Sequence, residues 1–340
     1  MANLDQSASG LSSVFAQKNA NIWRSIFKKY GIVTVLLVLC VVLSVISPYF
    51  LTVQNILNVL RQSSINGILA IGLSFVILTG GIDLSVGSVV ALAGIVGASF
   101  ATTSAVAGVV GAPYPAILAI AVGLGIGLAA GTVSGTIVAR FRVPSFVVTL
   151  GMLSSARGLT MLYTDGKPVP SLTPSFRWMG TGQLFGVPAP ILILLLVFAI
   201  SWWVLTKTRY GRYIYAVGGN PRAAATSGIN VKGIRRSVYM ISGLLAGLAG
   251  LLLAARTGSG LTQAGISYEL DAIAAVVIGG TSLSGGVGSI TGTLVGTLII
   301  AVMNNGLDLL GVDSNYQQFI KGLMIVCAVL IDTSRQSEAE

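Results

Sequence analysis

The sequence contains no histidine and only two cysteines in 340 residues. Histidine is the side chain best suited to transfer protons at neutral pH and a common metal ligand, so its absence excludes histidine-based catalysis and histidine metal sites. Cys40 and Cys327 both lie in apolar runs, and two cysteines are too few for a cysteine-rich disulfide or zinc framework. We therefore expect no metal, no cofactor and no enzyme active site in this chain.

Charged residues are also scarce, at 9% of the chain, against about 25% in a typical soluble domain. With 54% hydrophobic residues, so few charges could not cover the surface of a water-soluble protein of this length. The 20 basic and 10 acidic residues leave a net charge of +10, which in a membrane protein indicates basic cytoplasmic loops. No stretch interleaves aromatic and basic residues, so nucleic acid is not an expected partner.

Motifs for nucleotide and ion chemistry are absent as well. The phosphate loop G-x-x-x-x-G-K-[ST] occurs nowhere, and the nearest tripeptide, Asp165-Gly166-Lys167, is followed by Pro168. The apolar runs carry no paired carboxylates of the kind that relay protons, and no segment is similar to a selectivity filter. These absences disfavour an ATPase, a proton-coupled carrier and an ion channel.

Long runs without charge predict an all-α polytopic membrane protein. A spanning helix needs about 20 mostly apolar residues, so the charge-free run Leu84–Ala139 is long enough for two spans, separated by the break Gly111–Pro115. About ten spans are expected, at 31–47, 65–79, 86–101, 115–139, 144–163, 189–206, 238–255, 272–283, 289–304 and 316–332. The second, third, eighth and ninth are short and interrupted by glycine, so they are candidates for broken or re-entrant helices.

The basic residues predict which side of the membrane each loop faces. Most of them lie in the amino-terminal tail, in the turn at 140–142 and in the loop 207–237, which a ten-span count places on one side. That side is the cytoplasm, so both termini are expected there. The resulting organisation is a tail at 1–30, a transmembrane domain at 31–332 and a second tail at 333–340.

A glycine-rich motif occurs twice. Gly80–Gly87 reads G-G-x-x-L-S-x-G, and the same pattern returns at Gly279–Gly286. Short, glycine-interrupted segments repeated in two halves of a membrane protein point to a transport pathway. The alternative is two turns made alike by a composition with 43 glycines. The residues expected to line or brace a pathway are Gly80, Gly81, Asp83, Ser85, Gly279, Gly280 and Ser284.

Glycine also recurs at four-residue spacing, which places the residues of each series on one helix face. The three series are Gly127, Gly131 and Gly135; Gly243 and Gly247; and Gly288, Gly292 and Gly296. Such faces let two helix backbones approach closely, either within one bundle or between two copies of the chain.

Polar residues inside spans have two interpretations each. Asp83 is either a hydrogen-bonding cap for neighbouring helices or a solvated loop residue. Arg157 and Lys321 lie near the outer ends of their spans, where each either reaches the interface or lines a polar vestibule. Asn304 and Asn305 end the ninth span, and either offer amides to a substrate hydroxyl or cap the helix.

The loop 207–237 contains a predicted short helix. A helix from Pro221 to Ser227, ended by Gly228, fits the preference for proline at helix starts and glycine after helix ends. This helix either docks on a partner or simply turns the chain around.

Several motifs, in order, make the chain similar to a known family. It resembles the permease subunits of bacterial ABC importers for ribose and related monosaccharides, over about residues 30–332. The segments that carry the resemblance are Leu78–Ser88, Gly211–Ala216, Gly218–Asn220, Ser227–Val231, Tyr268–Ala274, Gly279–Leu283 and Asn304–Leu307.

The resemblance implies a machine of several subunits in the bacterial inner membrane. Two permeases, expected to be a homodimer surrounded by membrane lipid, form the translocation path. An ABC ATPase binds their cytoplasmic loops, and a periplasmic sugar-binding protein docks outside. The implied function is ATP-driven monosaccharide import, with ribose first and xylose, galactose, arabinose, allose and inositol as alternatives. A stand-alone secondary sugar carrier is the competing hypothesis.

The resemblance also implies a coupling role for the short helix in the loop. In the family this helix usually begins Asn-Glu-Ala-Ala, whereas here Asn220 is followed by proline, arginine and alanine. The expected ATPase contacts are Asn220, Arg222, Ala223, Ala224 and Gly228. The acidic residue of the family's pattern is therefore missing.

Overall fold

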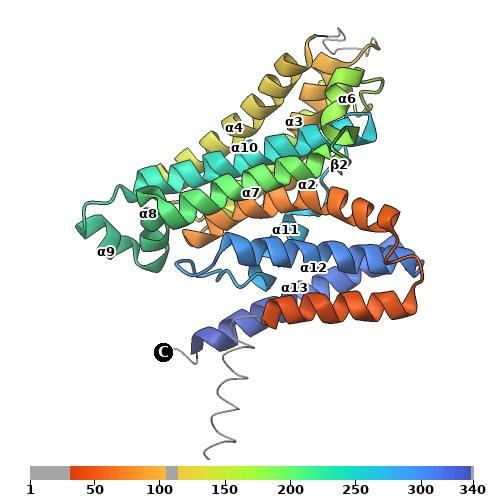
Figure 1. Ribbon diagram of the computed structural model, residues 1–340. Coiled ribbons are helices and arrows are strands. Elements are labelled where there is room, and N and C mark those ends of the chain that lie inside the picture. The colour runs from red at the N-terminus through yellow and green to blue at the C-terminus, as the bar shows by residue number, and fades with distance from the viewer. Residues whose placement is uncertain (1–30, 105–113, 338–340) are drawn as a thin grey trace, which may run out of the picture.

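The computed structural model describes residues 31–104 and 114–337, and these residues are mainly helical. The first helix among the described residues covers Gly31–Ile46. The further helices are α2 (Val53–Leu78), α3 (Val86–Ala101), α4 (Ala116–Phe141), α5 (Ser145–Thr164), α6 (Pro174–Thr181), α7 (Ala189–Lys207), α8 (Arg209–Gly219), α9 (Pro221–Thr226), α10 (Val231–Thr257), α11 (Tyr268–Ile278), α12 (Ile290–Leu309) and α13 (Ser314–Ser337) (Figure 1). The strands β1 (Gln183–Leu184) and β2 (Val187–Pro188) form a small antiparallel hairpin after α6, with Gln183 opposite Pro188.

Six helices in the described part of the chain are long and apolar enough to cross a membrane: α2, α4, α5, α7, α10 and α12. The helix Gly31–Ile46 and α3 are apolar but shorter. These helices confirm the predicted all-α membrane protein. The predicted number of about ten spans is not established by helix length and composition.

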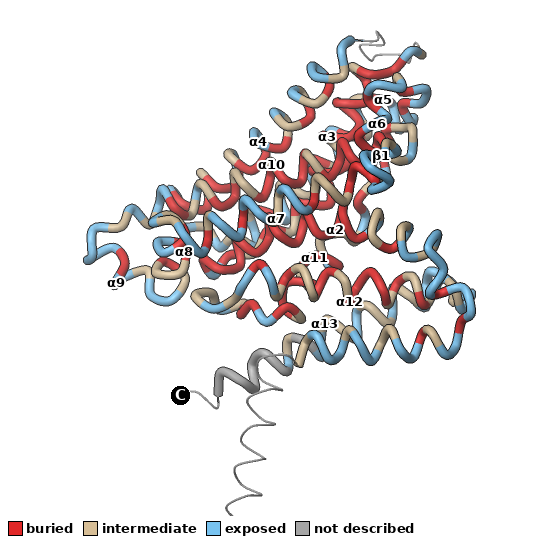
Figure 2. Tube along the Cα trace, in the orientation of Figure 1, coloured by how far each residue is buried: buried red, intermediate tan, exposed pale blue. Residues whose placement is uncertain are grey.

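Two helices, α2 and α10, form the centre of the molecule. In their most apolar windows, 83% of α2 and 72% of α10 is buried, compared with 17% of α5. Helix α10 packs against α4, α3 and α2, while α2 also contacts α12, α11 and α7. Figure 2 shows the buried residues concentrated along these inner helices. Residues such as Ile68, Leu73, Val238 and Leu251 fill this core.

Helices α4 and α10 approach each other through their glycine faces. A Cβ atom at Gly127 would lie 2.9 Å from the Cα atom of Gly247, and one at Gly135 would lie 2.7 Å from the Arg236 carbonyl oxygen. Only residues without side chains permit this backbone distance. The glycine series of α4 and α10 are thus partners of each other, which confirms packing within one bundle.

A second group of helices lies along one side of this centre. It comprises Gly31–Ile46, α11, α12 and α13, drawn in red and blue in the lower part of Figure 1. A small apolar cluster of Leu43, Phe50, Val59, Ala301 and Val302 joins the first helix, α2 and α12. Helix α11 contacts α12, α2 and α13.

Several predicted boundaries differ from the structure. Helix α2 begins at Val53, so residues 53–64 are helical rather than an outer connection, and Thr52 caps the helix by accepting a hydrogen bond from the Asn55 N–H. The loop 207–237 is mostly helical, because it contains α8, α9 and the start of α10. The tail 1–30, the last residues 338–340 and part of the predicted break at 111–115 lie outside the described residues.

Candidate translocation site

The first glycine motif ends α2 and leads back toward the core. Gly80 has a φ of +74°, a left-handed backbone conformation that favours glycine. A Cβ atom at Gly81 would lie 2.5 Å from the Tyr239 hydroxyl oxygen. These two positions therefore require glycine for different reasons, backbone conformation at Gly80 and close packing at Gly81.

Asp83 is a buried, fully hydrogen-bonded residue of the first motif, with 1% of its surface exposed. One carboxylate oxygen accepts hydrogen bonds from the Ser85 backbone N–H at 3.0 Å and from the Ser85 hydroxyl at 2.6 Å. The other accepts from the Ser242 hydroxyl at 2.9 Å. Asp83 thus connects the start of α3 to the middle of α10, and it is not a solvated loop residue.

The second glycine motif follows α11 and is similarly constrained. A Cβ atom at Gly279 would lie 2.6 Å from the Gly292 carbonyl carbon, so α11 and α12 touch through these glycines. Gly280, Gly285 and Gly286 have φ values of +85°, +87° and +75°. Ser284 is exposed, and its backbone N–H donates to the Ser282 hydroxyl at 3.2 Å.

The structure brings the two glycine motifs together, although they lie far apart in the sequence. The Gly286 N–H donates a hydrogen bond to the Leu78 carbonyl oxygen at 2.9 Å. A Cβ atom at Gly285 would lie 2.7 Å from the Gly80 nitrogen. The backbone of one motif therefore rests directly on the backbone of the other.

Helix α8 completes this contact. A Cβ atom at Gly218 would lie 2.5 Å from the Gly286 nitrogen. The Tyr215 hydroxyl donates to the Gly288 carbonyl oxygen at 3.0 Å, and burial raises the pKa of Tyr215, so the hydroxyl keeps its proton. We call the meeting point of Gly80, Gly218, Gly285 and Gly286 the glycine junction. Gly218 was not among the predicted path residues, because nothing in its spacing relates it to either motif.

A cavity of about 490 Å³ lies beside the first glycine motif. It is bounded by that motif, by the turn between α4 and α5 and by the first part of α10. Its lining includes Gly80, Gly81, Arg142, Ser145, Arg235 and Tyr239. This cavity is at the same end of the helical bundle as α8 and α9, since α10 begins directly after α9 (Figure 1).

Asn304 and Asn305 are not part of the glycine junction. They lie inside α12, which continues to Leu309, so of the two interpretations left open for them the helix cap is wrong. Asn305 and Asn55 exchange two side-chain hydrogen bonds of 2.9 and 2.8 Å, which join α12 to α2. From Gly292, Asn304 is 12 residues along the helix, a rise of about 18 Å.

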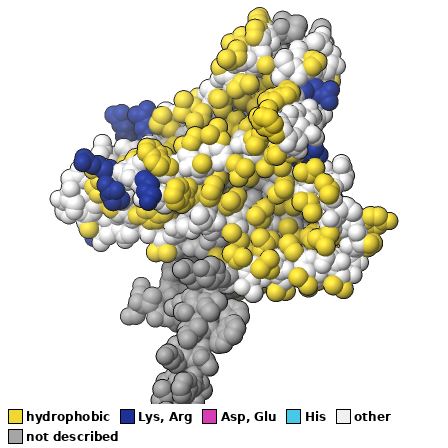
Figure 3. Space-filling model, in the orientation of Figure 1, with side chains coloured by type: hydrophobic (Ala, Val, Ile, Leu, Met, Phe, Trp, Pro, Cys, Tyr) yellow, Lys and Arg dark blue, Asp and Glu magenta, His cyan; other side chains and the backbone are white. Residues whose placement is uncertain are grey.

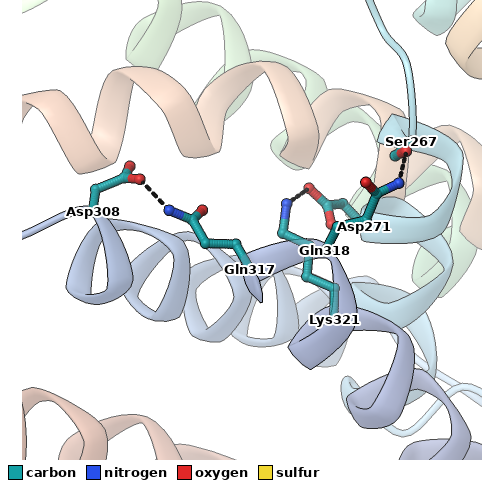
Figure 4. Close-up of polar contacts among 6 residues, drawn as sticks. All are labelled: Ser267, Asp271, Asp308, Gln317, Gln318 and Lys321. Atoms are coloured by element: carbon teal, nitrogen blue, oxygen red, sulfur yellow. Dashed lines mark hydrogen bonds and ion pairs between the residues drawn. The ribbon is translucent and has the colours of Figure 1, made fainter. Parts of the chain in front are cut away.

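Asn304 belongs instead to a polar cluster between α11, α12 and α13. It is buried, with 5% of its surface exposed, and hydrogen-bonds to Asp271. The Asn304 Oδ1 atom has no hydrogen-bond partner among the described residues. Asp271 also accepts from Lys321 at 3.1 Å (Figure 4), so Lys321 is paired with a carboxylate rather than extended to the interface.

Figure 4 shows two further contacts that hold α13. The Gln317 amide donates to Asp308 at 2.8 Å, and the Gln318 amide donates to the Ser267 hydroxyl at 3.5 Å. On the other side of the molecule, Arg157 of α5 donates to the carbonyl oxygens of Thr262 and Ala264, at 2.8 and 3.0 Å. Arg157 therefore binds the segment between α10 and α11.

The short helix α9 starts at the predicted residue, Pro221, and ends at Thr226, one residue before the predicted end at Ser227. The Asn220 side-chain oxygen accepts from the N–H groups of Arg222 and Ala223, both at 3.0 Å, and Pro221 occupies the first turn. Gly228 follows the helix with a φ of +82°. Ala224 is buried within the chain itself, whereas Arg222 and Ala223 are exposed. The face available to a partner is therefore the one with Arg222 and Ala223.

Known proteins are similar to this chain over most of its length. A family described as "Branched-chain amino acid transport system / permease component" matches residues 55–329. The chain is 50% identical over 305 residues to the ribose import permease protein RbsC of Escherichia coli K12, covering 88% of this chain and 92% of the relative. It is 46% identical over 314 residues to RbsC of Bacillus subtilis 168, covering 92% and 95%.

The name of a third relative refers to another sugar. The chain is 39% identical over 305 residues to the D-allose transport system permease protein AlsC of Escherichia coli K12, covering 89% of this chain and 91% of that protein. No solved structure matches the chain. The family match and the sequence identities with these relatives both extend over most of the chain. It belongs to the family of branched-chain amino acid transport system permease components, and it is a transporter subunit rather than an enzyme.

Proposed function

We propose that this chain is the membrane subunit of an ATP-driven ribose importer. The observation that carries the proposal is its identity with the two ribose import permeases, which extends along most of the chain and exceeds that with the D-allose permease. The absence of a phosphate loop from the sequence assigns ATP hydrolysis to a separate ATPase subunit. A periplasmic sugar-binding protein delivers the sugar to the outer face.

The proposed topology has ten membrane segments. Six are the helices of spanning length, and Gly31–Ile46, α3, α11 and α13 supply the other four. Helix α11 has 11 residues and rises about 16 Å, about half of the hydrocarbon core, so it enters the membrane without crossing it alone. The segment that follows it, which contains the second glycine motif, completes the passage to the cytoplasmic side, and α12 then crosses back as a span of its own.

Both termini are proposed to lie in the cytoplasm, together with α8 and α9. In Figure 3, Lys and Arg side chains gather at the end of the molecule that carries α8 and α9, while the middle of this face is hydrophobic. Such an excess of basic residues is typical of cytoplasmic loops. The glycine junction and the cavity beside it then face the cytoplasmic side of the transport path.

The path itself is proposed to lie between two copies of this chain, with the two glycine motifs bracing its cytoplasmic end. In the first motif, Asp83 holds α3 against α10 through its three hydrogen bonds. In the second, Gly279 allows α11 to touch α12. Because the motifs support each other through their backbones, a displacement of one segment must displace the other.

Coupling to the ATPase is proposed to pass from α9 through α8. Helix α9 follows α8 directly, and α8 contacts Gly286 of the second glycine motif and Gly288 just after it. The exposed residues Arg222 and Ala223 form the contact surface for the ATPase. A movement of α9 would therefore reach the glycine junction through one short, rigid helix.

The test is ribose uptake into vesicles that contain this chain with its ATPase and its binding protein. We expect uptake that needs ATP and both partners. Uptake by the chain alone would contradict the proposed importer and favour a stand-alone carrier. Uptake of D-allose in preference to ribose would contradict the proposal that ribose is the substrate. Chemical cross-linking of the purified complex would report whether it contains two copies of the chain.

A further inference from the structure

The cavity beside the first glycine motif is lined by two cations that have no anionic partner among the residues the structure describes. Arg142 ends α4 in a left-handed conformation, with a φ of +58°, and Arg235 lies in the first turns of α10. Both line the cavity of about 490 Å³, and no acidic side chain is among its lining residues. Neither arginine is in an ion pair with any residue in the described ranges.

The buried carboxylate of Asp83, in the motif beside the cavity, makes no ion pair with either arginine among the described residues. Asp83 already accepts hydrogen bonds from Ser85 and Ser242 on its two oxygens, and it does not line the cavity. Helix α5 begins at this wall, and no side chain caps its first turn. Its first residues, Ser145 and Phe146, both line the cavity, so uncapped backbone N–H groups add positive potential there.

The outer rim of the cavity is apolar and continues along α5. Phe146 lines the cavity and is 52% exposed, and Leu150, one turn further along the helix, is 44% exposed. These two side chains share a helix face because they are four residues apart. The site therefore combines a cationic wall, at the end of the bundle proposed to be cytoplasmic, with an apolar strip along α5.

We propose that this cavity binds the headgroup of an anionic phospholipid, with its acyl chains along Phe146 and Leu150 of α5. Basic pockets between membrane helices on the cytoplasmic side suit anionic headgroups, and a free phosphate compound would make no use of the apolar strip. The inference rests on the cytoplasmic orientation proposed above. A bound headgroup would also contact Gly80 and Gly81, and would join the α4–α5 turn to the first glycine motif.

The experiment measures lipid retained by the purified full-length chain. Phosphatidylglycerol and phosphatidylcholine with the same acyl chains are supplied in equal amounts, and the bound lipids are counted by native mass spectrometry. We expect a preference for phosphatidylglycerol that the double variant Arg142→Gln/Arg235→Gln reduces roughly 30-fold, because each cation at an anionic headgroup contributes about fivefold. The charge-retaining variant Arg142→Lys/Arg235→Lys should keep most of the preference.

The matched control is Arg140→Gln/Arg236→Gln, which removes two nearby exposed arginines that do not line the cavity. This control should retain the phosphatidylglycerol preference. Equal loss in both double variants, or equal binding of the two lipids by the unchanged chain, would overturn the proposal. Displacement of phosphatidylglycerol by glycerol phosphate would show that the cavity binds free phosphate compounds. Displacement by ribose would show that the cavity binds the sugar. Either result would overturn the proposed lipid site.

The measurement separates this inference from the proposed function. It uses neither ATP nor a partner protein, so a failure of ribose uptake leaves the lipid count unaffected. A variant that did not fold would be recognised by its thermal unfolding midpoint in detergent, and the lysine variant then supplies the comparison.

Discussion

At the scale of single residues, the Asp83 carboxylate is the clearest structural determinant. Replacement by alanine leaves the Ser85 N–H and the Ser242 hydroxyl without their acceptor in a buried site, which costs about 1–3 kcal/mol. We expect Asp83→Ala to lower the thermal unfolding midpoint of the purified chain and to reduce uptake. Asp83→Asn retains one acceptor oxygen and should have a smaller effect.

The control for Asp83 is Asp165→Asn. Asp165 is exposed and follows α5 in a left-handed conformation that asparagine tolerates. The thermal unfolding midpoint of the Asp165→Asn variant should equal that of the unchanged chain. An Asp83→Ala variant with the same midpoint as this control would contradict the bracing role.

Gly285 gives a second prediction at the residue scale. It has a left-handed backbone, and any Cβ atom would press on the Gly80 nitrogen at 2.7 Å. Gly285→Val should therefore separate the two motifs at a cost of about 1–3 kcal/mol from the backbone alone. We expect uptake to fall by about tenfold or more while the chain still enters the membrane.

Membrane insertion and uptake are measured on the same cells for the Gly285 variant. Gly151→Ala is its control, because Gly151 lies within α5 and has no atom within 4 Å of the added methyl group. Uptake close to normal in Gly285→Val would mean that contact between the motifs is dispensable for transport.

At the scale of elements, α9 is the segment through which an ATPase would act. Ala223→Glu places a charge on the exposed face of α9 and should abolish ribose-stimulated ATP hydrolysis by the reconstituted complex. Arg222→Ala should be mild, since an exposed ion pair contributes about 0–1 kcal/mol. Ala224 is unsuitable for this test, because it is buried within the chain, and a charge there would disrupt α9 itself. Full stimulation in Ala223→Glu would exclude α9 as the coupling element.

A second prediction at the scale of elements concerns the ion pair that attaches α13 to α11. Lys321→Ala leaves Asp271 buried without its cation, and breaking such a pair costs about 3 kcal/mol or more. We expect a lower unfolding midpoint in detergent. The double variant Lys321→Met/Asp271→Asn removes both charges but keeps a polar partner for Asn304, so it should recover much of the loss. Equal midpoints for the single and double variants would contradict the importance of this pair.

At the scale of the whole molecule, topology is the property to test. Cysteine substituted at Arg140 or Lys232 should react only with reagents that enter the cytoplasm, because both positions belong to the basic end of the bundle. Cysteine at Lys167 or Arg177 should react with impermeant reagents from outside. Labelling of position 232 from outside would reverse the orientation, and with it the placement of the α9 surface and of the lipid cavity.

The class of the molecule and many of its local features follow from the amino-acid sequence alone. The scarcity of charge predicts membrane helices because a charged side chain is costly in lipid. Pro221 and Gly228 predict the ends of α9 because their backbone preferences are local. The two glycine motifs, at Gly80 and Gly279, are visible in the sequence for the same reason. Each contains unusual backbone conformations, and glycine is the residue that adopts them.

Tertiary structure alone decided which of these local features meet. Asn304 and Asn305 follow an apolar run and so indicate a helix end, yet α12 continues to Leu309, and Asp271 and Asn55 from neighbouring helices hydrogen-bond to the two amides. Likewise, nothing local relates Gly218 to Gly286. Their contact depends on how α8 packs against the end of α2, and packing between distant segments is a property of the assembled core, because each such contact requires every helix between them to be in place.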